Sequence, residues 1–309
     1  MLVSLLALTL SAQPELPRPP TEPTPRSAFA VVETSGRIII AGGGAAGNLF
    51  DDTFAYDSKR EAWEQLPDLP SARAFTAAAA VNDQAYFFGG LGESPEPFKD
   101  AWRLDLSPPD GAQPLWAQLP DPPAARNRHA AAVINDRIYI MGGFEAAQPC
   151  SARVESFDAN QEVWREERDM NIGRHGHTAT VIAGKIYVVG GYTAAGPTDA
   201  AEVFDTETDT WTRLAPLPSA RGFHCAAEVD GKLYILGGRI RAEEPSYVYS
   251  PTLDTWDTLP AVPGVRGRAG CATAEGLILL FGGEDERGRE QPANRPLVFA
   301  VGERYWRER

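Results

Sequence analysis

A short apolar run that ends in two glycines recurs six times along the chain. Each run contains β-branched, aliphatic or aromatic residues, as in Ile138 to Met141, and turn residues bound it on both sides. Such a run is typical of a short buried β-strand. The pairs, spaced 45 to 53 residues apart, are Gly42-Gly43, Gly89-Gly90, Gly142-Gly143, Gly190-Gly191, Gly237-Gly238 and Gly282-Gly283.

Further positions repeat in the same register. An arginine stands sixteen residues before each pair: Arg26, Arg73, Arg126, Arg174, Arg221 and Arg266. Downstream, an aromatic residue precedes a tryptophan by seven positions in five units: Tyr56 and Trp63, Phe157 and Trp164, Phe204 and Trp211, Tyr249 and Trp256, Phe299 and Trp306. In the second unit Leu104 replaces the aromatic, and a turn-rich insert delays Trp116. A fixed period of this length indicates a repeat architecture.

Each unit is predicted to form four antiparallel strands. In the third unit, Ala130 to Ile134 forms the first strand, and Asn135-Asp136 turns the chain into the glycine-pair strand. A third strand carries the aromatic and a fourth the tryptophan. A single sheet of this kind cannot bury both apolar faces, whereas radial stacking of several sheets buries them. The small residues of the first strands suit the crowded axis, and the bulky tryptophans suit the wide rim. The glycine pairs permit neighbouring backbones to approach closely.

The repeat therefore predicts an all-β, six-bladed β-propeller of four-stranded antiparallel blades in one domain over residues 26–309. The expected blades are about 26–68, 73–121, 126–168, 174–216, 221–261 and 266–309. The first unit has its own first strand, and the last has its own Trp306 strand. We therefore expect blades contiguous in sequence, with the first and sixth meeting by face packing.

This pattern resembles the kelch repeat family, whose signature is a Gly-Gly doublet, then an aromatic, then a tryptophan. The resemblance covers residues 26–309 and extends to exported kelch proteins of bacteria. Departures are Leu104 in the second unit, and Ser250 and Ala300 where other units have Asp after the aromatic. Kelch domains of ubiquitin-ligase adaptors grip acidic side chains with Arg two positions after the repeated Arg. That resemblance implies such a role for Arg128 and Arg268.

The N-terminus resembles a secretory signal peptide over residues 1–12, although no Lys or Arg precedes its apolar run. The proline-rich residues 13–25 would form an extended tether. We therefore expect an extracytoplasmic protein, either periplasmic or secreted. The alternative is a misassigned start or a buried N-terminal strand, which would leave the protein cytoplasmic.

Composition narrows the range of partners. A net charge of −13 argues against non-specific DNA binding, which requires Lys and Arg to neutralise phosphates. No later apolar run is long enough to suggest integral membrane contact. Without Cys-x-x-Cys or His-x₃-His spacing, we expect no metal and no cofactor. Cys225 and Cys271 fall on adjacent first strands, where they form either a disulfide or buried thiols. We expect a monomer.

Positions that differ between units are the candidates for an asymmetric ligand, because positions common to all units must serve the scaffold. Two such sets, two residues after each Arg and directly after each glycine pair, should surround one mouth of the central channel. Together with neighbouring Arg241 they supply the candidate ligand-binding residues Phe75, Arg128, Phe144, Tyr192, Phe223, Arg239, Arg241, Arg268 and Glu284. Arginines among aromatics suit carboxylate or phosphate binding with stacking. The alternative is ordinary solvated loop residues.

Three histidines stand three positions after their Arg: His129, His177 and His224. Because they lie on separate consecutive blades and no carboxylate partner is implied, a structural role in hydrogen bonding is favoured over a ligand role.

These features predict a non-catalytic recognition domain that binds a protein, an acidic peptide or a glycan at the channel mouth. The chain contains no Gly-x-Ser-x-Gly, His-Glu-x-x-His or phosphate-loop motif. An alternative is a sugar-active enzyme resembling the periplasmic kelch sialic acid epimerases, with Glu284 and Arg239 the nearest acid–base candidates. A third is an assembly block that uses its outer faces.

Overall fold

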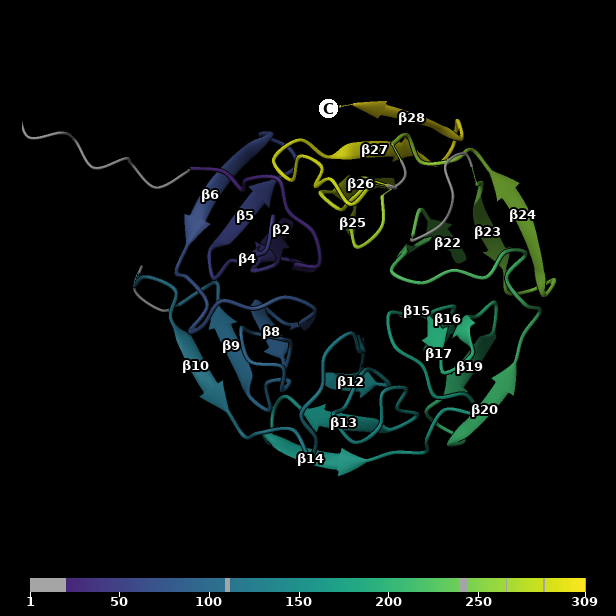
Figure 1. The fold of residues 1–309 in the computed structure, drawn as a ribbon, viewed down its shortest axis with the longest axis horizontal. Coiled ribbons are helices and arrows are strands. Elements are labelled where there is room, and N and C mark those ends of the chain that lie inside the picture. Colours follow the sequence, from purple (N-terminus) through teal and green to yellow (C-terminus); the bar gives the residue numbers. More distant parts are fainter. Residues whose placement is uncertain (1–20, 109–111, 239–243, 265, 286, 309) are drawn as a thin grey trace, which may run out of the picture.

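The computed structural model describes residues 21–108, 112–238, 244–264, 266–285 and 287–308. Its four-stranded antiparallel sheets, six in number, stand as blades around a central channel (Figure 1). The fold class predicted from the repeat is confirmed. Residues 1–12 of the predicted leader and most of the predicted tether lie outside the described residues.

Strands follow chain order within every blade. Blade 1 contains β1 (Ala30–Thr34), β2 (Arg37–Ala41), β5 (Thr53–Asp57) and β6 (Ala62–Leu66); blade 2 contains β7 (Ala77–Val81), β8 (Gln84–Phe88), β9 (Ala101–Asp105) and β10 (Trp116–Leu119); blade 3 contains β11 (Ala130–Ile134), β12 (Arg137–Met141), β13 (Val154–Asp158) and β14 (Val163–Glu166). Blade 4 contains β15 (Thr178–Ile182), β16 (Lys185–Val189), β19 (Ala201–Asp205) and β20 (Thr210–Arg213); blade 5 contains β21 (Cys225–Val229), β22 (Lys232–Leu236), β23 (Ser246–Ser250) and β24 (Thr255–Leu259); blade 6 contains β25 (Gly270–Ala274), β26 (Leu277–Phe281), β27 (Leu297–Ala300) and β28 (Tyr305–Glu308).

Two small hairpins extend the connections between second and third strands: β3 (Gly44–Ala45) with β4 (Asn48–Leu49), and β17 (Tyr192–Thr193) with β18 (Gly196–Pro197). Among the residues described, no helix has the length and apolar character that a membrane span requires.

The fourth strand of each blade runs along the rim, where its tryptophan fastens two blades together. In blade 3 the indole of Trp164 packs against Phe157 with ring centroids 5.0 Å apart. Each of the six rim indoles also donates a hydrogen bond to a carbonyl of the preceding blade. These bonds are Trp63 to Asn294, Trp116 to Pro67, Trp164 to Pro120, Trp211 to Arg168, Trp256 to Ala215 and Trp306 to Pro260. The rim placement expected from the sequence is confirmed.

The glycine pairs bring neighbouring backbones into contact. The second glycine of every pair donates its N–H to the carbonyl of the repeated arginine in the next blade. The bonds are Gly43 to Arg73 (2.8 Å), Gly90 to Arg126 (3.0 Å), Gly143 to Arg174 (2.9 Å), Gly191 to Arg221 (2.8 Å), Gly238 to Arg266 (3.1 Å) and Gly283 to Arg26 (2.9 Å). A Cβ on the first glycine would collide with that same carbonyl, as at Gly42, where it would lie 2.5 Å from the Arg73 oxygen.

The repeated arginines belong to the scaffold, as expected. Arg174 is fully buried and donates to the Gly190 carbonyl (3.2 Å) and to Glu202 (2.6 Å). The same bond to the first glycine's carbonyl recurs at Arg26, Arg73, Arg126 and Arg221. Their carboxylate partners are Asp52, Asp100, Glu155 and Glu244, respectively. Each of these guanidinium groups thus joins the end of the second strand to an acid of the same blade.

Blades 6 and 1 meet by face packing, as predicted, and lie next to each other in Figure 1 as the yellow and purple ends of the chain. Phe29, Ile40 and Tyr56 of blade 1 share an apolar cluster with Leu279 and Phe281 of blade 6. The Gly283–Arg26 bond repeats the backbone hydrogen bond between glycine and arginine that is found at every other seam. The ring is therefore closed by the same interactions that join consecutive blades, and no strand is exchanged.

The side chains of the three repeated histidines pack between neighbouring blades. A Cβ on Gly142 would lie 2.5 Å from Cε1 of His177, and one on Gly190 would lie 2.8 Å from Cε1 of His224. Phe29 takes the same place against Gly282 in the seam between blades 6 and 1. The expected hydrogen bond is present at His224, whose Nε2 lies 2.9 Å from Thr178 Oγ1. The structural role predicted for these positions is therefore mainly one of packing.

Burial keeps these imidazoles neutral. It lowers the pKa of His129 and His224 to about 3, and the nearby Arg126 and Arg221 lower each pKa further by charge repulsion. Burial also lowers the pKa of His177 well below its usual value.

The close contact between each glycine pair and the next blade predicts that two Gly→Ala substitutions differ in their loss of stability. Gly42 and Gly231 both have positive φ (+66° and +72°), but only Gly42 faces a neighbouring backbone. Gly231→Ala should cost about 1 kcal/mol of unfolding free energy from backbone strain alone. Gly42→Ala should cost about 1–3 kcal/mol more, because its methyl group meets the Arg73 carbonyl. Urea denaturation measures the free energy of unfolding of both variants. Equal losses would contradict a stabilising contact between Gly42 and the Arg73 carbonyl.

The buried histidines predict acid sensitivity. Because their folded pKa lies below the unfolded value near 6.5, their contribution to stability is complete above pH 6.5 and declines as pH falls toward about 3. Each would contribute a loss of about 1.4 kcal/mol per pH unit within that window. His129→Phe, which copies Phe29 of blade 1, should reduce the difference in unfolding free energy between pH 7 and pH 5. An unchanged difference would show that His129 does not titrate on unfolding.

Candidate binding site

A closed ring of backbone hydrogen bonds surrounds the mouth of the channel. It joins the residues two positions after each repeated arginine, one from every blade. The donors and acceptors are Ala28 to Arg268, Phe75 to Ala28, Arg128 to Phe75, Gly176 to Arg128, Phe223 to Gly176 and Arg268 to Phe223, at 2.7–3.1 Å. These six positions, which we call the mouth ring, were selected from the sequence because they vary between blades.

Every residue of the mouth ring has a left-handed backbone, with φ between +53° and +62°. Glycine accepts this conformation without strain, and blade 4 has Gly176. Phenylalanine at positive φ is an outlier, yet Phe75 and Phe223 both adopt it. The closed hydrogen-bond ring imposes the conformation, so the bulky side chains are held there at a cost. Such local strain is typical of functional positions.

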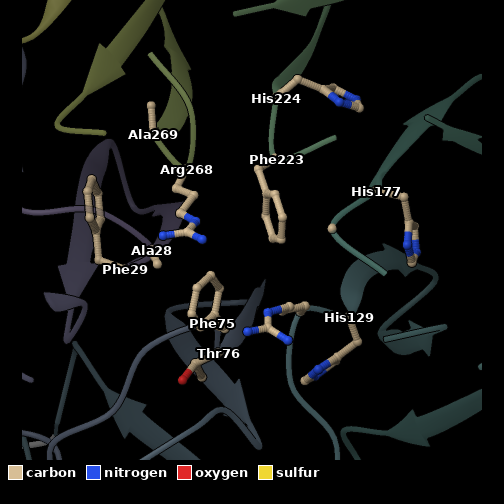
Figure 2. Close-up of a pocket in the computed structure, with 12 residues that line it drawn as sticks. Ala28, Phe29, Phe75, Thr76, His129, His177, Phe223, His224, Arg268 and Ala269 are labelled. Carbon is tan, nitrogen blue, oxygen red and sulfur yellow. The ribbon is translucent and has the colours of Figure 1, made fainter. Parts of the chain in front are cut away.

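The mouth-ring side chains converge on a cavity of about 170 Å³. Phe75 and Phe223 come from opposite blades, and their ring centroids lie 5.9 Å apart. The guanidinium carbon of Arg268 lies 5.2 Å and 5.3 Å from these two ring centroids, and that of Arg128 lies 4.7 Å from Phe75. Figure 2 shows Phe75, Phe223 and Arg268 pointing toward one another, whereas His177 and His224 point away along the ring.

A second circle of residues lies beside the mouth ring. The positions directly after the glycine pairs form backbone bridges with the positions directly after the repeated arginines, as in Asn127 with Phe144 and Gly267 with Glu284. Phe144 lies 5.6 Å from the Arg128 guanidinium carbon. Tyr192 lies 5.5 Å from Phe223, measured between ring centroids. The two sets of candidates therefore form one continuous surface.

The two arginines of the mouth ring have different electrostatic partners. Arg268 forms an ion pair with Glu284 at 3.2 Å, and Glu284 is itself buried. Among the ion pairs of the described residues, none includes Arg128. Burial lowers the pKa of Arg128 from its usual value, and the Arg268 charge lowers it further. Arg128 is thus a partly buried cation stacked on Phe75, a setting in which a ligand carboxylate would be favourable.

The structure brings seven of the nine candidates together: Phe75, Arg128, Phe144, Tyr192, Phe223, Arg268 and Glu284. Arg239 and Arg241, the other two, lie outside the described residues. Whether these positions bind a ligand stays a prediction.

One residue of this surface was missed from the sequence. His175 stacks on Tyr192 with centroids 5.7 Å apart and planes 13° apart, and it lies 6.0 Å from Phe223. Burial and the Arg128 charge lower its pKa to about 4, so the imidazole is neutral at pH 7. Its position, directly after the repeated arginine, also varies between blades. Extending the comparison of units by that one position would have identified it.

Comparisons with known proteins agree with this architecture. The model of the KLHDC2/KLHL20/DRC7 kelch-repeats domain matches residues 5–166 and 112–283. An F-box/kelch-repeat protein of Arabidopsis thaliana is 30% identical over 45% of this chain and 35% of its own length. The Rab9 effector protein with kelch motifs of Xenopus laevis is 36% identical over 24% of this chain and 20% of its own length.

An enzyme is also among the relatives. The N-(sulfonatooxy)prop-2-enimidothioate sulfolyase of Thlaspi arvense is 27% identical over 38% of this chain and 36% of its own length. The chain thus matches only about a third or less of the length of these relatives. With its family-model match and its six registered repeats, the chain belongs to the kelch-repeat family.

Proposed function

We propose that the channel mouth binds an acidic segment of a partner protein, with Arg128 as the principal contact for a ligand carboxylate. Kelch propellers are typically protein-interaction domains, which supports a protein partner. The observation that carries the proposal is the difference between the two mouth arginines. Arg268 already holds Glu284, whereas Arg128 stacks between Phe75 and Phe144 outside every ion pair of the described residues.

The surroundings of Arg128 favour a charge-assisted hydrogen bond. Stacking against two rings fixes the guanidinium plane, so little side-chain freedom remains to be lost when a carboxylate binds. Partial burial reduces screening by water and strengthens the pairing. Tyr192, His175 and Phe223 provide an adjoining aromatic surface on which an apolar residue of the same segment would pack. The local positive charge contrasts with a chain of net charge −13.

The test is a peptide and glycan array probed with the purified protein. The peptides come in pairs. One member contains Asp and Glu, and the other has Asn and Gln at the same positions. We expect the acidic member of a pair to bind and the amide member to bind weakly. Selective binding of anionic glycans in place of peptides would overturn the protein partner, and binding of neither would overturn the site.

Arg128→Gly separates binding from folding. A charge-assisted hydrogen bond of about 1.5–3 kcal/mol predicts a loss of roughly 10- to 100-fold in affinity for the acidic peptide. Stability should be unchanged or slightly higher, because φ at this position is +56° and glycine accepts it. Arg128→Lys should retain part of the affinity, since it keeps the charge without the bidentate geometry.

Arg213→Ala is the matched control, because Arg213 is an exposed arginine on the rim strand β20. It changes the net charge of the chain as Arg128→Gly does, but it lies away from the mouth. Isothermal titration with a peptide selected on the array measures all variants. Equal affinity of Arg128→Gly and wild type would remove Arg128 from the site.

A further inference from the structure

Two cysteine side chains meet in the seam between blades 5 and 6. Cys225 begins β21, and its Sγ lies 3.3 Å from the Ala269 carbonyl of blade 6. Cys271 lies in β25, and its Sγ lies 3.4 Å from the Ala226 carbonyl of blade 5. Each sulfur therefore reaches across the seam toward the other's strand. Burial and the neighbouring Cys271 side chain both raise the pKa of the Cys225 thiol.

The two thiols differ in access. Cys225 is buried, at 3% exposure, within the apolar cluster of the seam. Cys271 is partly exposed. It lines a cavity of about 400 Å³ in the central channel, which is bordered by the first strands of the blades. A small reagent entering this cavity would thus meet Cys271, whereas Cys225 does not line the cavity. Cys150, the third cysteine of the chain, lies in blade 3.

We propose that Cys225 and Cys271 form an oxidisable pair that closes a disulfide between blades 5 and 6. The geometric support is that each sulfur contacts a carbonyl next to the other cysteine's segment, because a disulfide requires side chains that do not point apart. The reagent is a low-molecular-weight disulfide such as oxidised glutathione, or a thiol–disulfide oxidoreductase.

The reaction proceeds by two exchanges. The Cys271 thiolate attacks one sulfur of the reagent disulfide, forms a mixed disulfide and releases the reagent's first thiol. The Cys225 sulfur, after giving its proton to solvent, attacks Cys271 Sγ and releases the second thiol. The pair loses two protons and two electrons, and the reagent disulfide gains them. Burial raises the pKa of the Cys225 thiol, which makes the second exchange the slow one.

The bond would join the two blades that contribute Phe223 and Arg268, two of the six positions of the mouth ring. Cys225 follows Phe223 by two residues, and Cys271 follows Arg268 by three. The Arg268 N–H already donates to the Phe223 carbonyl at 2.9 Å. Blade 6 contacts its neighbours through packing and hydrogen bonds, and a covalent link to blade 5 would retain it when the seam with blade 1 opens. Oxidation would therefore suppress local opening of blade 6.

The experiment uses the full chain with Cys150→Ser, which leaves only the two seam thiols. The protein is incubated with reduced or oxidised glutathione, alkylated, digested with trypsin without reduction and examined by mass spectrometry. Trypsin separates the two cysteines into peptides 222–232 and 269–287. We expect oxidised samples to contain these peptides joined, with a mass lower by two hydrogens than their sum. Free peptides, or glutathione attached to Cys271 without the joined species, would overturn the pair.

A second measurement tests the consequence. Hydrogen exchange of β25–β28 should slow on oxidation of Cys150→Ser, and the melting temperature should rise by several degrees. Neither change should occur in Cys150→Ser/Cys271→Ala, which is the matched control. A joined species without slower exchange would show that the disulfide forms but does not restrain blade 6.

Discussion

The propeller depends on one backbone contact repeated at six seams: the N–H of the second glycine bonded to the arginine carbonyl of the next blade. It requires two backbones to approach so closely that a Cβ on the first glycine would collide with the same oxygen. In the five blades described above, the arginine whose carbonyl is used also sends its side chain back to its own blade, where it bonds the first glycine's carbonyl and an acid. One residue therefore organises both the blade and the seam.

The same contact explains why the mouth is available for recognition. The chain turns inward directly after each repeated arginine, and the inward residues are tied into the mouth ring by their own backbone groups. Since the backbone ring is complete whatever the side chains are, the side chains are free to differ. Ala28 and Gly176 leave space, whereas Phe75, Phe223, Arg128 and Arg268 fill the centre at positive φ. Strain is accepted at these positions because the ring around them is rigid.

Charges in this protein are buried in two distinct ways. The scaffold arginines lie beside carboxylates of their own blades, as Arg174 does beside Glu202, so the pairing offsets part of the desolvation cost of burying both charges. At the mouth, Arg268 is paired in the same way with Glu284, but Arg128 is held mainly by stacking on aromatic rings. A partly desolvated cation in this setting gains more from an arriving carboxylate than an exposed arginine on the rim would.

The sequence by itself determined the number of blades, their contiguity and the location of the mouth, because the period, the glycine pairs and the turn residues are local signals that each blade repeats. It also placed Phe75, Arg128, Phe223 and Arg268 on one ring, since equivalent positions in equivalent blades must be related by the propeller's rotation. Only the tertiary structure decided which side chains meet. The contact of Phe75 with Phe223, the pairing of Arg268 with Glu284 and the contacts of Cys225 and Cys271 across their seam join different blades or different loops. The directions of Phe75, Phe223 and Arg268 also depend on left-handed backbone angles at the mouth ring.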